Sequence, residues 1–233
     1  MDADHARDLV RSIDYWHHRF EIFPGVITPG AYDARPLLDL ARLPADLRGR
    51  RALDVGTSDG YFALELARRG AEVTAIDYRE KTGHGFAVME ALNPDVRIEY
   101  RTVNLFDLPS LGLGEFDIVW FMGVLYHLPD MIRGLHVVRQ ACRGELYLET
   151  RCENDFAKKV SAARYYARDS LGGDLCNFWA PNRLCVLDML TDTGFTPERD
   201  EAWTRDRLFV KARANAGDQV AGRKMKYGYG LFD

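Results

Sequence analysis

The chain has 233 residues, a hydrophobic fraction of 47% and a formal net charge of −4 at pH 7. This length fits one domain with additions, and the composition allows a sizeable core. The acidic balance argues against nucleic acid as the main partner, because phosphate binding favours a basic surface, although it leaves room for a local basic groove. No apolar run approaches the ~20 residues of a membrane helix, and the polar N-terminus lacks signal-peptide features.

The four cysteines stand at positions without a CxxC pair or a small disulfide framework: Cys142, Cys152, Cys176 and Cys185. Such spacing is typical of free thiols in a reducing cytoplasm and does not match a zinc site. We therefore expect a cytoplasmic protein without a bound metal. Its oligomeric state stays open, with a homodimer as one alternative.

The N-terminal part, residues 1–50, is expected to form a helix and a lid segment. Apolar residues at helical spacing run over residues 3–20. The Pro- and Gly-rich stretch 21–33 predicts an extended loop, and a short helix is expected at 35–42.

From residue 51 onward, strand and helix patterns alternate, which is typical of a parallel sheet with crossover helices. The expected strands are 51–55, 71–76, 97–103, 116–121, 145–150, 197–203 and 207–213, and the expected helices are 60–69, 81–92, 129–142 and 182–193. The fold class is therefore α/β, with a Rossmann-like, seven-stranded, mostly parallel sheet covered by helices on both faces. A short turn predicts that the last two strands form an antiparallel pair at the sheet edge. The domain would span 51–213, with an inserted cap at 151–181 and a tail at 214–233.

A tight turn with Gly56 and Gly60 joins the first of these strands to its helix. Ligands of open α/β sheets bind at such a turn. A dinucleotide fingerprint would place further glycines where Ser58 and Tyr61 stand, so the turn suits a nucleoside ligand without phosphates. Asp54 offers an acceptor for a cationic, ammonium-bearing ligand, and so does Asp59.

The next strand ends at Asp77, ~20 residues past the turn, where a carboxylate can accept both ribose hydroxyls. A helix N-cap is the alternative for Asp77. Tyr78 lines the adenosine site or lies on the surface. Asn104 could bond an adenine amino group with Leu105 against the ring, or be a loop residue. The complete predicted cofactor set is Asp54, Gly56, Thr57, Ser58, Gly60, Asp77, Tyr78, Asn104, Leu105, Met122 and Gly123.

These motifs resemble the Rossmann-like (class I) S-adenosylmethionine-dependent methyltransferases over about residues 51–213. The combination LDVGTSDG…AID…FDIVWFMGVLYHL carries the resemblance, which implies S-adenosylmethionine as cofactor. FDIVWFMGVLYH, ELYLET and NFWAPN are most similar to the tRNA-uridine carboxymethyltransferase-like subgroup. The chain departs from that subgroup in the loop that begins at Phe23 and near Trp203, where the cations expected to hold a carboxylated cofactor are missing.

The resemblance therefore implies methyl transfer to an O or N atom of a small molecule, in biosynthesis or specialised metabolism. A tRNA wobble-uridine (carboxy)methyltransferase is the alternative, and a cofactor-binding protein without catalysis is a third hypothesis. Candidate bases or acceptor contacts are His127, Tyr126, His17 and His18, each of which could instead be structural.

The cap and the segment 16–32 are expected to lie over the carboxyl ends of the strands and to exclude water. Tyr126, Trp179 and one of His17 and His18 would then line one pocket. We expect that replacing 16–32 by a linker abolishes turnover and spares most cofactor affinity. The predicted substrate contacts are Tyr32, Arg151, Tyr165, Asn177 and Trp179, although these residues could equally form a dimer surface or simple packing.

Overall fold

The computed structural model describes residues 2–156 and 159–216, and the chain divides into two compact units at Leu105. Seven of the strands belong to one mixed sheet, three of them in the first unit and four in the second. The predicted α/β fold with a seven-stranded, mostly parallel sheet is therefore confirmed. Among the described residues, no helix is long and apolar enough to cross a membrane.

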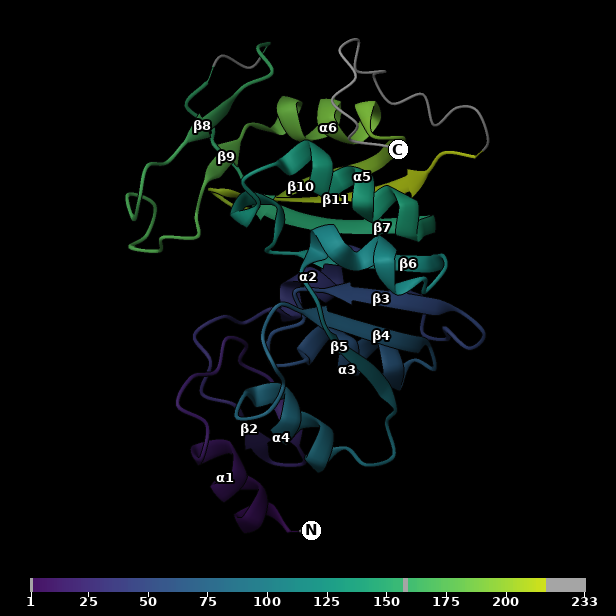
Figure 1. The fold of residues 1–233 in the computed structure, drawn as a ribbon. Coiled ribbons are helices and arrows are strands. Elements are labelled where there is room, and N and C mark those ends of the chain that lie inside the picture. Colours follow the sequence, from purple (N-terminus) through teal and green to yellow (C-terminus); the bar gives the residue numbers. More distant parts are fainter. Residues whose placement is uncertain (1, 157–158, 217–233) are drawn as a thin grey trace. The chain divides into compact units, whose positions relative to one another are not determined.

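The first unit holds three parallel strands in the order β3-β4-β5. Its elements are α1 (Ala3–Arg11), β1 (Glu21–Phe23), β2 (Val26–Ile27), α2 (Arg35–Ala41), β3 (Arg51–Val55), α3 (Tyr61–Arg68), β4 (Glu72–Asp77), α4 (Gly85–Leu92) and β5 (Ile98–Thr102). Helix α1 and the small β1–β2 hairpin pack beside α4 (Figure 1). The predicted alternation is confirmed here, with α4 four residues shorter at its start than expected.

The first helix is shorter than its apolar spacing predicts. It ends at Arg11, and the Ser12 hydroxyl donates a hydrogen bond to the Leu9 carbonyl. The indole of Trp16 turns back to the Val10 carbonyl at 3.0 Å. Helical spacing over 3–20 was thus a wrong indicator beyond Arg11, because tertiary contacts of the following residues replace helical hydrogen bonds.

The Pro- and Gly-rich stretch predicted as a loop contains the β1–β2 hairpin. Its turn is Pro24–Gly25, with Gly25 at φ 73°. Proline followed by a residue with positive φ is the combination that a type II turn requires. The extended conformation was predicted correctly, whereas the pairing was not.

The second unit contains four strands in the order β10-β11-β7-β6. Its elements are η1 (Leu105–Leu111, starting at the boundary), β6 (Phe116–Met122), η2 (Leu125–His127), α5 (Met131–Ala141), β7 (Cys142–Arg151), β8 (Ala163–Tyr165), β9 (Trp179–Pro181), α6 (Arg183–Asp192), β10 (Phe195–Thr204) and β11 (Arg207–Ala214). β11 is antiparallel to both of its neighbours, and β10 lies at the edge. The predicted antiparallel pair is confirmed.

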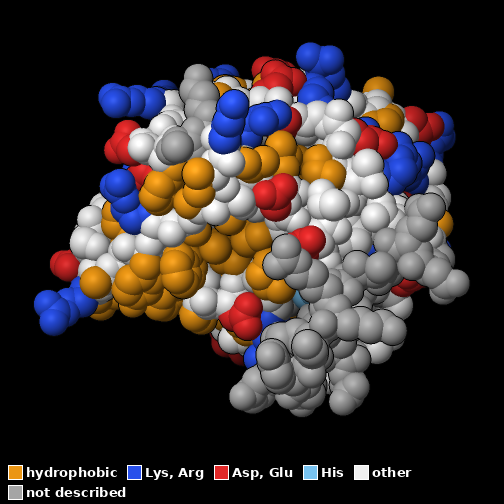
Figure 2. Space-filling model, turned by 90° about the horizontal axis from the view of Figure 1, so that it is seen from above, with side chains coloured by type: hydrophobic (Ala, Val, Ile, Leu, Met, Phe, Trp, Pro, Cys, Tyr) orange, Lys and Arg blue, Asp and Glu red, His pale blue; other side chains and the backbone are white. Residues whose placement is uncertain are grey.

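The inserted cap, for which no strands were predicted, contains the antiparallel β8–β9 hairpin beside α6 (Figure 1). Three of its large apolar side chains are exposed: Val160, Tyr165 and Leu175. Figure 2 shows hydrophobic side chains gathered on the face seen from above. Most of the predicted tail, residues 217–233, lies outside the described residues.

A β-bulge interrupts the pairing of β6 with β7 near the start of both strands. The register runs from Phe116 opposite Cys142 to Ile118 opposite Glu145, so two residues of β7 oppose Asp117. One of the two is Gly144, where an added Cβ would lie 2.2 Å from the backbone oxygen of Asp117. Backbone cannot yield as a flexible side chain does, so this position accommodates glycine alone without a shift of the strands.

Gly144→Ala is therefore expected to lower the free energy of unfolding by about 1–3 kcal/mol, the usual cost of forced overpacking. Urea denaturation measures it. Leu175→Ala, at a side chain that is 71% exposed, is the control and should change stability by less than about 0.5 kcal/mol. Equal stability of the Gly144 variant and the native chain would contradict the close approach.

Candidate cofactor and substrate sites

The turn after β3 is built from residues in the left-handed region. Gly56, Ser58 and Gly60 have φ of 71°, 55° and 83°. Gly56 and Thr57 donate their backbone N–H groups to the Ile76 carbonyl of β4, and Gly60 donates to Thr57. A side chain at Gly60 would clash with Met89 of α4. The turn is thus a rigid link between strand and helix, as its glycine pattern predicts.

Asp54, at the end of β3, is a buried carboxylate in the first unit. Its Oδ2 has no hydrogen-bond partner among the described residues. Burial is the main cause that raises the pKa of Asp54 to about 7, and the nearby charge of His18 opposes that rise. A buried acceptor of this kind gains from a ligand ammonium group, because an opposite charge compensates its desolvation. The residues of the turn therefore fit the cationic ligand that the sequence predicts.

Asp77 is placed at the end of β4, as predicted, and is also buried. One oxygen accepts the backbone N–H of Ser58 at 3.0 Å, and the other accepts that of Arg79 at 3.1 Å. The half-buried Arg79 guanidinium pairs with the same carboxylate at 3.2 Å. Asp77 is therefore not the cap of α4, which begins eight residues later. No pattern in the sequence predicted the pair with Arg79.

The remaining predicted cofactor residues of this unit differ in exposure. Tyr78 is 73% exposed beside Arg79, and Leu105 is buried. Asn104 is exposed and lies two residues after the end of β5. Thr57 is buried within the turn. A role for each at the cofactor stays a prediction.

Asp59 makes contacts that the sequence analysis did not predict. Its buried carboxylate accepts the backbone N–H groups of His17 and His18 at 2.9 and 2.8 Å and contacts Nδ1 of His18. Burial raises the pKa of Asp59, but the charge of His18 and the hydrogen bonds from His18 outweigh this effect. The pKa of Asp59 is therefore below its ordinary value. Asp59 therefore anchors the N-terminal segment, and its contact with a ligand ammonium group stays a prediction.

The two histidines are not helical residues, and only one is exposed. His18 is buried among the rings of Tyr61 and Phe62, whereas His17 stacks on Tyr32 with ring centroids 5.3 Å apart. The Tyr15 hydroxyl lies 3.2 Å from Nδ1 of His17. The structure thus brings His17, His18 and Tyr32 together within the first unit. Because Tyr126 and Trp179 belong to the second unit, the pocket predicted to join all of them stays a prediction.

In the second unit, Gly123 follows Met122 at the end of β6. It has φ 69°, and its N–H donates to the Glu149 carbonyl of β7 at 3.0 Å. The side chain of Glu149 is fully buried and pairs with Arg207 at 3.2 Å. Burial raises the pKa of Glu149 to about 7, against the lowering effect of Arg207. A carboxylate therefore lies behind the loop to which the sequence assigns contacts with the cofactor and substrate.

Arg207 also holds Tyr126. Its Nη2 donates to the Tyr126 hydroxyl at 3.3 Å, and its Cζ lies 4.9 Å from the centre of the ring. Burial raises the pKa of Tyr126, so the phenol is neutral at pH 7. Since the hydroxyl oxygen accepts from a guanidinium, its own proton points away from Arg207. Tyr126 is therefore suited to donate a hydrogen bond rather than to act as a base.

His127 lies against Tyr126, with ring centroids 4.0 Å apart. Its Nδ1 is 2.9 Å from the Cys176 carbonyl. A carbonyl oxygen only accepts, so Nδ1 carries the proton and Nε2 of the neutral ring keeps its lone pair. Burial lowers the pKa of His127, which favours this neutral form at pH 7. The geometry is compatible with a base, and that role stays a prediction.

The cap is tied to η2 by hydrogen bonds. Phe178 N–H donates to the Tyr126 carbonyl, and the Trp179 indole donates to the Pro129 carbonyl at 3.2 Å. Tyr165 packs edge-on against Trp179 with 57% of its surface exposed.

The two other predicted substrate contacts of this unit have polar partners inside it. Asn177 donates to the Leu171 carbonyl, and Arg151 pairs with Asp206 at 2.9 Å. The structure gathers Tyr126, His127 and Trp179, whereas Arg151 is directed to the β10–β11 turn.

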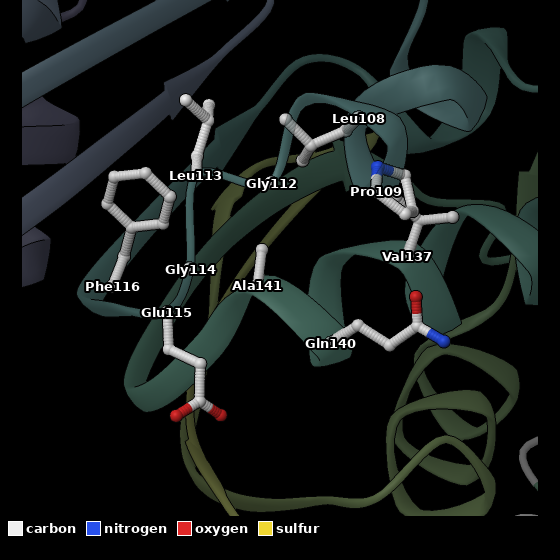
Figure 3. A pocket seen from close by; sticks show the side chains of 10 residues that line it. All are labelled: Leu108, Pro109, Gly112, Leu113, Gly114, Glu115, Phe116, Val137, Gln140 and Ala141. Carbon is white, nitrogen blue, oxygen red and sulfur yellow. The ribbon is translucent and has the colours of Figure 1, made fainter.

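A cavity of about 230 Å³ opens elsewhere in the second unit, between η1 and α5 (Figure 3). Leu108 and Pro109 line one side, and Val137 and Ala141 line the other. Phe116, at the start of β6, also lines it, whereas Met122 and Gly123 stand at the opposite end of that strand. The cavity is therefore separate from the predicted site.

Three functional candidates were missed by the sequence analysis: Arg79, Glu149 and Arg207. For Glu149 a signal existed, because a charged residue stands inside the buried strand pattern ELYLET. Buried acids of this kind require a cation, and the pattern does not say which arginine supplies it.

Comparison with known proteins defines the class. The Methyltransferase domain family model matches residues 15–199, and the chain belongs to this family. Curated relatives include the ubiquinone biosynthesis O-methyltransferases of Xanthomonas oryzae pv. oryzae (strain PXO99A) and Bordetella avium (strain 197N). The first is 36% identical over 138 residues, 56% of each chain, and the second is 40% identical over 91 residues, 39% of this chain and 37% of that protein. The chain thus matches about half the length of the first relative.

Solved structures show the same fold. The N-terminal domain of EvdMO1, solved in the presence of SAH and D-fucose, is 21% identical, with a TM-score of 0.70 over 93% of this chain and 98% of that chain. The 1,6-didemethyltoxoflavin-N1-methyltransferase of Burkholderia thailandensis is 18% identical, with a TM-score of 0.60 over 78% of this chain and 76% of that chain. At these identities the likeness concerns the fold.

The Glu149–Arg207 pair makes a prediction about stability. Arg207→Met leaves a buried carboxylate unpaired and should cost about 3–5 kcal/mol at pH 8. Glu149→Gln imitates the protonated acid. The native Glu149 holds its proton in the folded state between its ordinary pKa of 4.5 and about 7, so its contribution falls as pH rises through that window. The Gln variant should therefore gain stability relative to the native chain from pH 5 to pH 8.

Urea denaturation at both pH values tests this. Arg213→Met is the matched control, because Arg213 lies on the same strand, half exposed, and pairs with Glu198. Its loss should cost no more than about 1 kcal/mol. Equal costs for the two arginine variants would contradict the buried pair.

Proposed function

We propose that the protein is an S-adenosylmethionine-dependent methyltransferase that acts on an O or N atom of a small molecule. The observation that carries this proposal is the turn after β3, with the buried carboxylates of Asp54 and Asp77 at the ends of neighbouring strands. Family membership and relatives named as O-methyltransferases support it. Both reported neighbours were crystallised with S-adenosylhomocysteine (SAH), which supports S-adenosylmethionine as the cofactor of this chain.

In this proposal the first unit binds the cofactor through the residues of its turn. Asp54 would accept the ammonium group, and Asp77 would accept the ribose hydroxyls beside Ser58. When bound, S-adenosylmethionine supplies a methyl group made electrophilic by the positive sulfur. The protein then has to orient the acceptor and receive its proton, which are the two tasks of positioning and general-base catalysis.

Residues of the second unit would serve the acceptor. Tyr126 donates a hydrogen bond to an acceptor oxygen, with its hydroxyl oriented by Arg207. His127 would take the acceptor proton on Nε2. Trp179 and Tyr165 offer aromatic faces for a planar substrate. The exposed His17 and the half-buried Tyr32 are further candidates for substrate contact.

The relatives reported above do not favour the tRNA-modifying alternative, and the net charge of −4 gives it no support either. The curated relatives are named as O-methyltransferases of ubiquinone biosynthesis, which supports an oxygen atom as the acceptor. Incubation of the protein with metabolite extracts and a labelled methyl donor would identify the acceptor. Transfer of label to RNA alone would contradict a small-molecule acceptor. A cytoplasmic location and a homodimer remain predictions.

The role of Asp77 makes a prediction about cofactor binding. Charge-assisted hydrogen bonds to ribose are worth ~1.5–3 kcal/mol each, so Asp77→Ala should weaken S-adenosylhomocysteine binding by roughly tenfold or more. Calorimetry measures the affinity, and thermal unfolding checks the fold.

Asp46→Ala is the matched control. Asp46 pairs with Arg48 two residues later, as Asp77 pairs with Arg79, but lies on the surface away from the turn. Its loss should leave affinity unchanged. A native-like affinity in the Asp77 variant would place the ribose elsewhere, and absence of binding by the native chain would overturn the cofactor itself.

A further inference from the structure

Asp59 connects two parts of the first unit that are far apart in the sequence. On one side are residues 15–32, which we call the N-terminal strap. Three donors of the strap converge on the Asp59 carboxylate, whose side chain is 3% exposed: two backbone N–H groups and the His18 ring. A buried carboxylate with three hydrogen bonds is strongly oriented, because each lost bond would leave a desolvated charge.

On the other side is the turn assigned above to the cofactor. Asp59 stands between Ser58 and Gly60, both in the left-handed region. The N–H of Ser58 donates to Asp77, so the turn is held by Asp77 on one flank and by the strap on the other. Gly85 of α4 packs closely against both Asp59 and Trp16. A Cβ at Gly85 would lie 2.7 Å from Cβ of Asp59 and 2.8 Å from the Trp16 ring.

The strap is itself a pre-assembled unit. Tyr32 N–H donates to the His17 carbonyl, and Arg19 N–H donates to the Tyr32 carbonyl at 2.8 Å. The Thr28 hydroxyl donates to the His18 carbonyl at 2.7 Å. Gly30 approaches so closely that a Cβ would lie 2.2 Å from the His18 oxygen. A displacement at His17 and His18 therefore moves the whole strap.

We propose that Asp59 is a positioning residue that couples the strap to the cofactor turn, so that S-adenosyl ligand binding and strap closure stabilise each other. This inference rests on the proposed function. Coupling between two sites is reciprocal: if a closed strap orders the turn for the ligand, the ligand must favour the closed strap by the same factor. Loss of the strap should then weaken cofactor binding, in contrast to the expectation from the sequence.

The test uses S-adenosylhomocysteine as the probe. In the native chain, saturating ligand should slow hydrogen exchange of the His17 and His18 amides by about fivefold or more, within the usual range of coupling. Asp59→Asn should weaken binding in calorimetry by roughly tenfold and abolish the ligand-dependent slowing, because the amide group lacks the charge that draws three donors together. A direct contact between ligand and strap would leave the slowing intact in this variant and would overturn the role of Asp59.

Asp33→Asn is the matched control, since the Asp33 carboxylate follows the strap and pairs with Arg35 instead of the turn. It should keep native affinity and native slowing. If the Asp59 variant does not fold, His18→Phe provides a second test. The phenylalanine ring fills the same aromatic cluster and removes only the contact between the His18 ring and Asp59. This variant should weaken S-adenosylhomocysteine binding by about threefold.

The outcomes separate the two proposals. If the native chain does not bind S-adenosylhomocysteine, the proposed function fails. If it binds but the strap amides exchange at the same rate with and without ligand, or the Asp59 and His18 variants keep native affinity, the coupling fails and the proposed function stands.

Discussion

Three buried carboxylates surround the turn between β3 and α3: Asp54 at the end of β3, Asp59 within the turn and Asp77 at the end of β4. Like charges that are buried near one another need partners, because neither water nor the protein interior screens them well. Asp59 is satisfied by His18 and two backbone donors, and Asp77 by Arg79 and two more. Asp54 keeps one buried oxygen without a partner among the described residues. A ligand that brings positive charge to the turn would compensate that oxygen.

The second unit also contains a buried carboxylate, Glu149, and the topology of its strands supplies the cation that pairs with it. β11 runs antiparallel to β7, with Arg207 opposite Arg151 and Phe209 opposite Glu149. The first residue of β11 therefore reaches the carboxyl end of β7, where Glu149 is buried. If β11 were parallel to β7, its last residue and not its first would lie at the carboxyl end of β7. The reversed strand thus brings Arg207 between a buried acid and the ring of Tyr126, and connects β11 to η2, which follows β6.

The sequence predicted what depends on local pattern and missed what depends on distant partners. Strand–helix alternation and the glycine turn gave the sheet, because periodicity and positive φ are properties of a few adjacent residues. The end of the first helix at Arg11 was missed because His17 and His18 give their N–H groups to Asp59, more than forty residues away. Arg207 was missed for the same reason, since its partners are Glu149 and Tyr126. The β8–β9 hairpin was missed because three-residue strands leave no readable alternation.

Asp54 links protein stability to ligand binding through one proton. Its pKa is about 7 in the folded protein and 3.8 ordinarily, so the folded state holds the proton between these values and the unfolded state does not. The contribution of Asp54 to stability is therefore greatest at low pH and declines as pH rises through that window. A cationic ligand prefers the ionised carboxylate, so its affinity changes in the opposite direction and rises until the pH passes about 7. The carboxylate that weakens the free protein at neutral pH is thus the one that a bound ammonium group would stabilise. The nearby charge of His18 compensates the desolvation of Asp54 only in part, and the cofactor proposed here would supply a further positive charge.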